Sequence, residues 1–352
     1  MGAFIVRRLI AVFFMLVALV ATTFVMFSAL PADPAALSCG KNCEPQQIEV
    51  IRERLGLDES MGSQLARYAV GIPCGRFYPA DGPIMACPAF DDSLQPQDGQ
   101  FECPAPCLGY SFRTGDDVTS IIVKAMPITI SVALGAFVLF LVVGILMGIY
   151  AALRRGRWQD RTTMGAALIG YSFPSFFIGL VLLYFVVFLP PKLFDGWQPL
   201  PYPEWVPLSE NPWGWFEALI LPWITLALLY AAFYARLTRN QMLETLGEDY
   251  IRTARSKGLP ERTVIFKHGL RAGLTPIVTA AGLDLAFLLG GAVIVEQVFA
   301  LPGLGRATID AISDSDLQLI IGVVIVTSVI VLIANLIVDI LYAAIDPRVR
   351  LT

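Results

Sequence analysis

The sequence predicts an all-α integral membrane protein, and three observations support this. Hydrophobic residues make up 56% of the 352 residues and charged residues only 15%, well below the roughly 25% charge of soluble proteins. The mean hydropathy is +0.66. The apolar residues gather in runs long enough to cross a hydrocarbon layer of about 30 Å as helices. A net charge of −4, with basic residues in short clusters beside apolar runs and not on one broad face, gives no support to nucleic-acid binding.

Six apolar runs are expected to be transmembrane helices, and basic clusters predict their orientation. The runs are Leu9–Leu30, Ile128–Leu153, Met164–Leu189, Ala218–Phe233 with some extension at each end, Leu274–Phe299 and Leu317–Ile345. Lys/Arg clusters precede the first run and follow the second, fourth and sixth. They are Arg7 and Arg8, the four arginines between Arg154 and Arg161, the block around Arg252, and Arg348 with Arg350. The positive-inside rule therefore predicts cytoplasmic N- and C-termini.

Residues 1–30 are expected to form an N-terminal transmembrane helix. Two arginines followed by an apolar run also fit a cleaved secretory signal, whose apolar core is about 7–15 residues long. The longer run here favours a retained helix.

Residues 31–118 are expected to form an extracytoplasmic loop or subdomain. All six cysteines of the chain fall within it: Cys39, Cys43, Cys74, Cys87, Cys103 and Cys107. An even number of cysteines on the oxidising side of a membrane indicates disulfides, although the sequence leaves their pairing open. A metal site is the weaker interpretation because the single histidine, His268, is predicted on the other face. We expect no metal site, and we expect disulfides to stabilise a subdomain with too few apolar residues for its own core.

Residues 119–352 are expected to form a core of five helices, and few charges lie inside its spans. Asp284 falls ten residues into the fifth run, where an unpaired carboxylate costs about 2.5–3.5 kcal/mol. It either packs against a neighbouring helix or lines a hydrophilic path, and the sequence does not decide between these. Glu296 is nearer the end of that run, and Gly290 and Gly291 allow close helix packing or a bend. These four residues are the candidates for a translocation path.

Residues 237–274 are expected to form a cytoplasmic loop between the fourth and fifth spans. Met242, Leu246, Tyr250, Ile251 and Ala254 recur at helical spacing, and charges lie on the other face. Gly258 is expected to end this helix as a left-handed cap. The interleaved acidic residues disfavour a helix that only binds lipid, so a protein partner is the better interpretation.

No motif in the sequence provides enzyme chemistry. We find no phosphate-binding loop, no H-E-x-x-H and no G-x-S-x-G, so neither a catalytic residue nor a cofactor is expected in this chain.

Several ordered motifs resemble the B-type permease subunits of ATP-binding-cassette (ABC) importers, in the dipeptide, oligopeptide and nickel branch. The resemblance covers nearly the whole chain. The motifs are "LPADP", "IRERLGLDES", "LGYSFRTGDDV", "YSFPSFFIGL", "LPWITLALLYAAFYARLTRNQML", "EDYIRTARSKGL" with "HGLRAGLTPIV", "GGAVIVEQVFALPGLGRATIDAI" and "NLIVDILYAAIDPRVR".

This resemblance implies a type I ABC importer transmembrane domain with six helices in the cytoplasmic (inner) membrane. It implies a second, C-type permease, two ABC ATPase subunits that bind ATP and Mg, an extracytoplasmic substrate-binding protein, and a peptide as cargo. It also implies that a coupling loop docks on an ATPase. The residues of that loop are Asp249, Tyr250, Arg252, Ala254, Arg255, Lys257, Gly258 and Leu259.

The chain departs from the family pattern in three places, and other functions stay open. Ala32 replaces a usual glycine, the E-A-A signature of the wider importer family is absent, and the insert at 71–107 has no counterpart in the short form of the loop. Nickel chelates, glutathione or another small solute are alternative cargoes. An ion-coupled secondary transporter or a receptor would also fit the spans, but neither explains the coupling loop.

Overall fold

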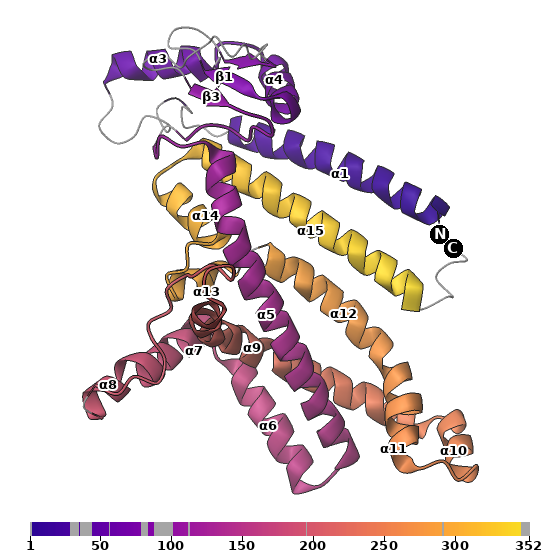
Figure 1. Ribbon diagram of the computed structural model, residues 1–352. Helices are drawn as coiled ribbons and strands as arrows, with labels where there is room; N and C mark the ends of the chain where they lie inside the picture. The colour runs from indigo at the N-terminus through magenta and orange to yellow at the C-terminus, as the bar shows by residue number, and fades with distance from the viewer. Residues whose placement is uncertain are drawn as a thin grey trace. The chain divides into compact units, whose positions relative to one another are not determined.

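The computed structural model describes residues 2–28, 35, 44–55, 57–78, 84–87, 101–111, 113–194, 196–290 and 292–345. These residues form two compact units (Figure 1). One unit comprises Ile128–Pro302 with Ile330–Thr352, and the other comprises Gly2–Pro127 with Gly303–Val329. We call them the core unit and the outer unit. Two long helices, α5 (Val118–Leu153) and α15 (Leu317–Ile345), contribute to both.

The outer unit combines helices with a small sheet. Its helices are α1 (Gly2–Ser28), α3 (Pro45–Leu55), α4 (Met61–Cys74) and α14 (Leu304–Ser313), together with the first parts of α5 and α15. The strands β1 (Arg76–Tyr78), β2 (Met85–Ala86) and β3 (Phe101–Cys103) form an antiparallel sheet in the order β2-β1-β3. In this sheet Phe77 lies opposite both Met85 and Glu102.

Disulfides join elements of the outer unit. One bond links Cys74 at the end of α4 to Cys87, and another links Cys103 to Cys107, with Cα–Cα distances of 5.0 and 5.4 Å. These pairs confirm that cysteines of the 31–118 segment form disulfides. The two other predicted participants, Cys39 and Cys43, lie outside the described residues.

A buried arginine organises the sheet of the outer unit. Arg76 donates a hydrogen bond of 2.7 Å to the backbone oxygen of Tyr68, and its guanidinium lies 4.2 Å from the centre of the Tyr68 ring. The Tyr68 hydroxyl donates to the Leu108 carbonyl at 3.2 Å. Burial raises the pKa of Tyr68 to about 12. These contacts give the segment a packed interior besides its disulfides.

The core unit is a bundle of helices. In chain order it contains α6 (Trp158–Ser172), α7 (Ser175–Leu182), the π-helical segment η1 (Leu183–Phe188), α8 (Pro190–Leu193), α9 (Pro212–Gly247), α10 (Asp249–Ser256), α11 (Glu261–Thr263), a second π-helical segment η2 (Val264–Leu270), α12 (Arg271–Leu289) and α13 (Val293–Val298). The side-chain oxygen of Asn211 caps α9 by accepting hydrogen bonds from the backbone N–H groups of Trp213 and Gly214, at 3.1 Å each. Pro212 occupies the first turn of α9, where a backbone N–H has no helical acceptor, so its missing N–H costs nothing.

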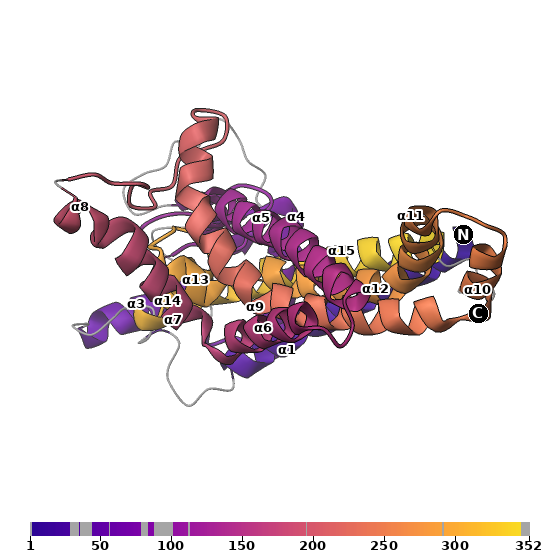
Figure 2. The ribbon, with the colours of Figure 1, turned by 90° about the horizontal axis from the view of Figure 1, so that it is seen from below.

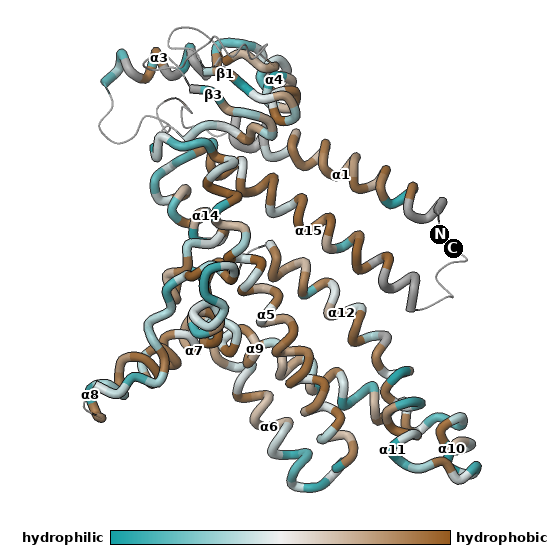
Figure 3. The backbone as a smooth tube through the Cα atoms, viewed as in Figure 1, coloured by the Kyte–Doolittle hydropathy of each residue, from teal (hydrophilic) through white to brown (hydrophobic). Residues whose placement is uncertain are grey.

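Five described helices are long and apolar enough to cross a membrane, and a sixth span is reached if one bent pair is counted as a single crossing. The five are α1, α5, the stretch Ser175–Leu193, α9 and α15. Their apolar character is visible in the hydropathy-coloured trace (Figure 3). The last predicted run, Leu317–Ile345, coincides with α15.

Two predicted spans are interrupted. The expected helix Met164–Leu189 breaks between α6 and α7, because Phe173 is extended before Pro174, and proline disfavours the helical region for its predecessor. The expected helix Leu274–Phe299 ends at Leu289, where Gly290 caps α12. Pro276 lies inside α12, and the segments Glu261–Leu274 and Pro276–Leu289 are bent by 50°, as expected of a residue that removes a helical hydrogen bond.

Glycines on α5 allow it to pack closely on α9. A Cβ placed on Gly144 would lie 2.6 Å from Tyr234 Cβ, and one on Gly148 would lie 2.6 Å from the Ala235 carbonyl oxygen. Glycines four residues apart share one face of a helix. The sequence analysis did not single out this spacing, "GILMG".

Candidate functional site

The segment between α9 and α12 forms a structured protrusion of the core unit. Figures 1 and 2 both place α10 and α11 together at one extremity of that unit, beyond the ends of α9 and α12. The chain turns at Glu248, which is extended (φ −69°, ψ 150°), so α10 is a separate helix. The single helix expected across Met242 and Ala254 is therefore wrong, and α9 continues to Gly247, within the predicted loop 237–274.

An apolar cluster attaches α10 to both of its neighbours. Ile251 and Ala254 on α10 pack against Val264 at the start of η2 and against Leu246 near the end of α9. Ile251 and Val264 are fully buried, and burying a side chain of this size stabilises a structure by about 1.5–3 kcal/mol. Tyr250 was predicted on this face but is 45% exposed. The cluster makes α10 rigid with respect to α9 and η2.

A glycine turn ends α10 as the sequence predicted. Gly258 has φ +74°, its N–H bonds to the Arg255 carbonyl at 2.9 Å, and the Leu259 N–H bonds to the Ala254 carbonyl at 3.4 Å. These two bonds are the Schellman motif, in which a left-handed residue satisfies the last helical carbonyls. A Cβ at Gly258 would meet nothing within 4 Å, so the position faces open space.

Charged side chains cover the outer surface of the protrusion. Arg255 pairs with Glu261 across the glycine turn at 2.9 Å, and Arg252 pairs with Asp249 at 3.3 Å. Exposed pairs of this kind contribute about 0–1 kcal/mol, so they order the surface without stabilising the fold much. Lys257 and Leu259 are also exposed. Arginine beside exposed tyrosine is typical of protein interfaces.

The end of α5 packs beside the base of the protrusion. Ile149 and Ala152 on α5 form a cluster with Met242 on α9 and Ile265 on η2. The basic turn that begins at Arg154 follows α5 directly. The structure therefore brings together two of the basic segments that the sequence predicted on one side of the membrane.

Asp284 lies on α12 and has a hydrogen-bonding partner. The Tyr234 hydroxyl on α9 donates to its carboxylate at 2.6 Å. The ring of Phe140 on α5 stacks on both Tyr234 and Tyr230, with centroid distances of 5.0 Å. Tyr234 is buried, whereas Asp284 is half-buried. The carboxylate is thus both held by a neighbouring helix and partly accessible, so both sequence-based interpretations stay open.

The other candidates for the path lie around the α12–α13 connection. Glu296 on α13 is fully buried, and the Thr129 hydroxyl on α5 donates to it at 2.7 Å. Gly290 caps α12 through its N–H bond to the Ala286 carbonyl at 3.1 Å, and Gly291 lies outside the described residues. Glu296 and Asp284 therefore bond to different helices, α5 and α9.

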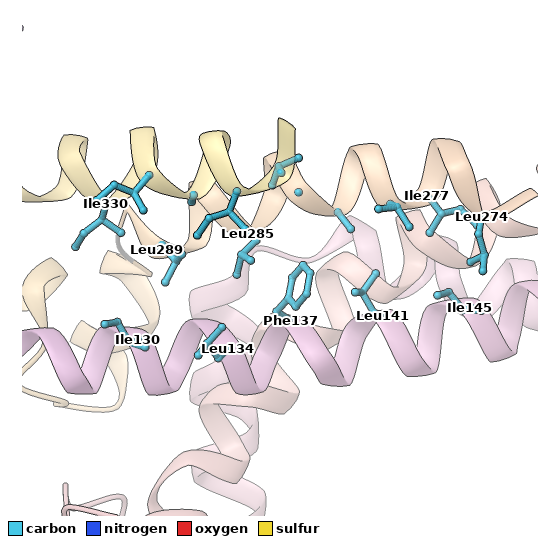
Figure 4. A pocket seen from close by; sticks show the side chains of 17 residues that line it. Ile130, Leu134, Phe137, Leu141, Ile145, Leu274, Ile277, Leu285, Leu289 and Ile330 are labelled. Atoms are coloured by element: carbon cyan, nitrogen blue, oxygen red, sulfur yellow. The ribbon is translucent and has the colours of Figure 1, made fainter. Parts of the chain in front are cut away.

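An apolar groove runs between α5, α12 and α15 within the core unit (Figure 4). Its volume is about 480 Å³ and its lining consists of aliphatic side chains, glycine and one aromatic ring, Phe137. Leu134 and Leu141 on α5 face Ile277 and Leu285 on α12 across it. This lining solvates no charge, so the groove suits an acyl chain or an apolar helix and not a hydrated peptide.

Sequence reasoning missed an ion pair between α6 and α9. Arg239 donates to Asp160 through Nε and Nη2, at 2.6 and 2.7 Å. The Gly156 N–H donates to the same carboxylate at 3.0 Å. The bond from Arg239 is the main reason why the pKa of Asp160 is lowered to about 2. These residues are far apart in sequence, and a carboxylate in the first turn of a helix is common on its own, so no local signal marks the pair.

The core unit thus defines a helical membrane protein in which a rigid, charged protrusion connects two long helices. The comparisons with known proteins specify the class further. Residues 144–351 match the family described as "Binding-protein-dependent transport system inner membrane component", and residues 1–99 and 94–133 match its N-terminal part. The chain belongs to this family of inner-membrane transport components.

Relatives resemble the chain over its full length. It is 37% identical over 351 residues to a peptide transport system permease protein of Brucella abortus, with 99% of each chain covered. It is 35% identical over 348 residues to the glutathione transport system permease protein GsiC of Escherichia coli, covering 99% of this chain and 98% of GsiC. A chain of the MetNI methionine ABC transporter, solved in inward-facing form, has a TM-score of 0.51 at 19% identity and covers 65% of this chain and 97% of that chain; this likeness concerns the fold.

Proposed function

We propose that the chain is the permease subunit of an ATP-driven peptide importer, and that α10 with its glycine turn docks on a separate ATPase subunit. The observation that carries the docking role is the cluster of Ile251, Ala254 and Val264, with Leu246 of α9 packed against it. This cluster holds α10 against both η2 and α9. A force applied to α10 is therefore transmitted to two membrane helices. The docking surface comprises Asp249, Tyr250, Arg252, Arg255, Lys257, Gly258 and Leu259. Ala254, which was also expected on this surface, is buried in the cluster.

ATP drives transport through this docked segment. Closure of two ATPase subunits around ATP and Mg draws the docked segments of two permeases together and tilts their helices, which is a rigid-body form of alternating access. Hydrolysis then resets the complex. ATP hydrolysis belongs to the ATPase subunits, and this chain supplies no catalytic group.

A second, C-type permease completes the path. In this arrangement six spans cross the inner membrane, the bent pair Glu261–Leu274 and Pro276–Leu289 counting as one, and both termini are cytoplasmic. The apolar groove between α5, α12 and α15 faces lipid or the second permease. Asp284, Glu296, Gly290 and Gly291 are the residues we assign to the path. Asp284 is available to a cargo ammonium group because it is only half-buried.

Peptides are the proposed cargo because the full-length relative from Brucella abortus is described as a peptide permease. Glutathione, the cargo in the name of GsiC, is the second candidate and is itself a small peptide. An extracytoplasmic binding protein delivers the cargo, so much of the selectivity lies outside this chain. Residues 71–107, which contain both described disulfides, contribute to its docking surface.

Gly258→Trp tests the docking assignment in the complete importer reconstituted in proteoliposomes. The indole adds bulk where a Cβ meets nothing within 4 Å, and it projects toward the ATPase. We expect the complex to hydrolyse ATP without stimulation by the loaded binding protein, and peptide uptake to fall at least about tenfold, equivalent to about 1.4 kcal/mol of lost coupling.

Gly156→Trp is the matched control. Gly156 has φ +76°, close to the +74° of Gly258, and it also has no neighbour within 4 Å of a Cβ. Both substitutions therefore impose similar backbone strain. Uptake should be retained in Gly156→Trp, and equal uptake by the two variants would reject the docking role of α10.

A further inference from the structure

A second cavity of the core unit lies between α6 and α9. Its volume is about 280 Å³. One part of its lining is polar and the other is apolar. The polar side chains are Tyr171, Arg236, Arg239 and Asn240, and the apolar ones are Met164, Ala167, Leu168 and Ala232.

The two arginines of this cavity differ in whether a carboxylate neutralises them. Arg239 is fixed and neutralised by its two hydrogen bonds to Asp160. Arg236, one turn earlier on α9, is exposed, and within the part of the chain that the structure describes no ion pair engages it. Residues three apart lie on the same helix face. The cavity therefore presents one uncompensated positive charge beside the amide of Asn240, with a second guanidinium held in place.

The surroundings of the cavity match the polar boundary of a membrane. Trp158, at the start of α6, is 70% exposed, and the exposed arginines Arg154, Arg155 and Arg157 precede it. Tryptophan and arginine are enriched at that boundary. Met164 and Leu168 lie about two to three turns further along α6, so the apolar lining extends from this boundary toward the membrane interior.

We propose that this cavity binds the phosphate headgroup of an anionic phospholipid from the leaflet beside the basic turn, Arg154–Arg157. Arg236 and Asn240 bind the phosphate, and Met164, Ala167 and Leu168 contact the glycerol and the start of an acyl chain. Basic pockets beside transmembrane helices are suited to anionic headgroups, and α9, which carries Arg236 and Asn240, is one of the helices long and apolar enough to cross a membrane. A carboxylate of a peptide cargo would use the cations but would leave the apolar lining exposed to water, so the lipid fits better.

Bound lipid would link α6 to α9, the helix that leads into the α10 protrusion. The Arg239–Asp160 pair already joins these helices by protein contacts, and the headgroup adds a second link through Arg236. This inference concerns a lipid site and does not depend on the identity of the cargo.

Native mass spectrometry of the full chain, titrated with phosphatidylglycerol or phosphatidylcholine, tests the proposal. We expect at least one phosphatidylglycerol to be retained at concentrations where phosphatidylcholine is lost. Arg236→Gln should lower the retained phosphatidylglycerol at least about fivefold. Arg161→Gln is the matched control, because it removes the same charge from an exposed position on α6 that does not line the cavity.

Three outcomes would overturn the proposal. Equal loss of phosphatidylglycerol in Arg236→Gln and Arg161→Gln would show that only general surface charge attracts lipid. Displacement of the lipid by millimolar inorganic phosphate would show that the site recognises a free anion. Displacement of phosphatidylglycerol by a dipeptide would assign the cavity to cargo. A melting temperature of Arg236→Gln equal to that of the parent in zwitterionic detergent would confirm that the variant folds.

Discussion

The close packing of α5 on α9 makes Gly148→Ala a sensitive test of the core unit. A Cβ at position 148 would lie 2.5 Å from Thr238 Cβ and 2.6 Å from the Ala235 carbonyl oxygen, whereas ordinary contacts lie at 3.4–4 Å. The helices must therefore separate by nearly 1 Å at this point, and the backbone oxygen cannot rotate away. Overpacking of this kind costs about 1–3 kcal/mol, and an alanine gain in helix propensity of up to about 1 kcal/mol offsets part of it.

Thermal unfolding of the purified chain in detergent measures this cost. We expect Gly148→Ala to melt at a lower temperature than the parent protein. Gly165→Ala on α6 is the control, because a Cβ there would meet nothing within 4 Å, so only the propensity gain applies and the melting temperature should be unchanged or higher. If the two alanine variants melted alike, the close approach of α5 and α9 would be refuted.

Three further predictions concern the ion pair, a disulfide and a buried acid. The pKa of Asp160 is lowered from 3.8 to about 2. The ion pair with Arg239 therefore contributes about 2 kcal/mol of stability above about pH 4, and this contribution is lost as the pH falls toward 2. Asp160→Asn should lower the melting temperature at neutral pH and should melt like the parent near pH 2. Replacing Cys74 and Cys87 by serine opens a loop with a sequence separation of 13, which should cost the outer unit about 3 kcal/mol and speed its proteolysis. Glu296→Gln keeps an acceptor for the Thr129 hydroxyl and should unfold near the parent temperature. Glu296→Ala removes that acceptor and should lower the stability by about 2–4 kcal/mol. Equal melting temperatures of these two variants would contradict the role of this hydrogen bond.

Local sequence signals predicted the long helices and the end of α10. Composition and run length identified α15 and the membrane class, and the left-handed preference of glycine placed the turn at Gly258. The presence of disulfides within the 31–118 segment was also expected from its predicted compartment, although their pairing was not. Each of these depends on residues close together in the chain or on a bulk property, which is why a single sequence contains the information.

The interruptions of helices and the contacts between residues distant in sequence could not be predicted from the sequence. The interruptions at Pro174 and Gly290 fall inside continuous apolar runs, because run length measures hydropathy and not backbone geometry. Tyr250 satisfies helical spacing with Leu246, but the extended residue Glu248 separates their helices and exposes the tyrosine. The pairs Arg239–Asp160 and Tyr234–Asp284 join residues distant in sequence, so only the three-dimensional packing reveals them.

Cross-linking from position 252 tests the proposed mechanism most directly. Arg252 is an exposed residue of α10, with 73% of its side chain accessible, so Arg252→Cys should form a cross-link to an ATPase subunit in the assembled importer and should be protected from impermeant thiol reagents added outside intact cells. Glu102→Cys, exposed on the outer unit, should react with those reagents and form no such cross-link. A cysteine at 252 that reacts from outside the cell, or that cross-links to no ATPase subunit, would contradict the account.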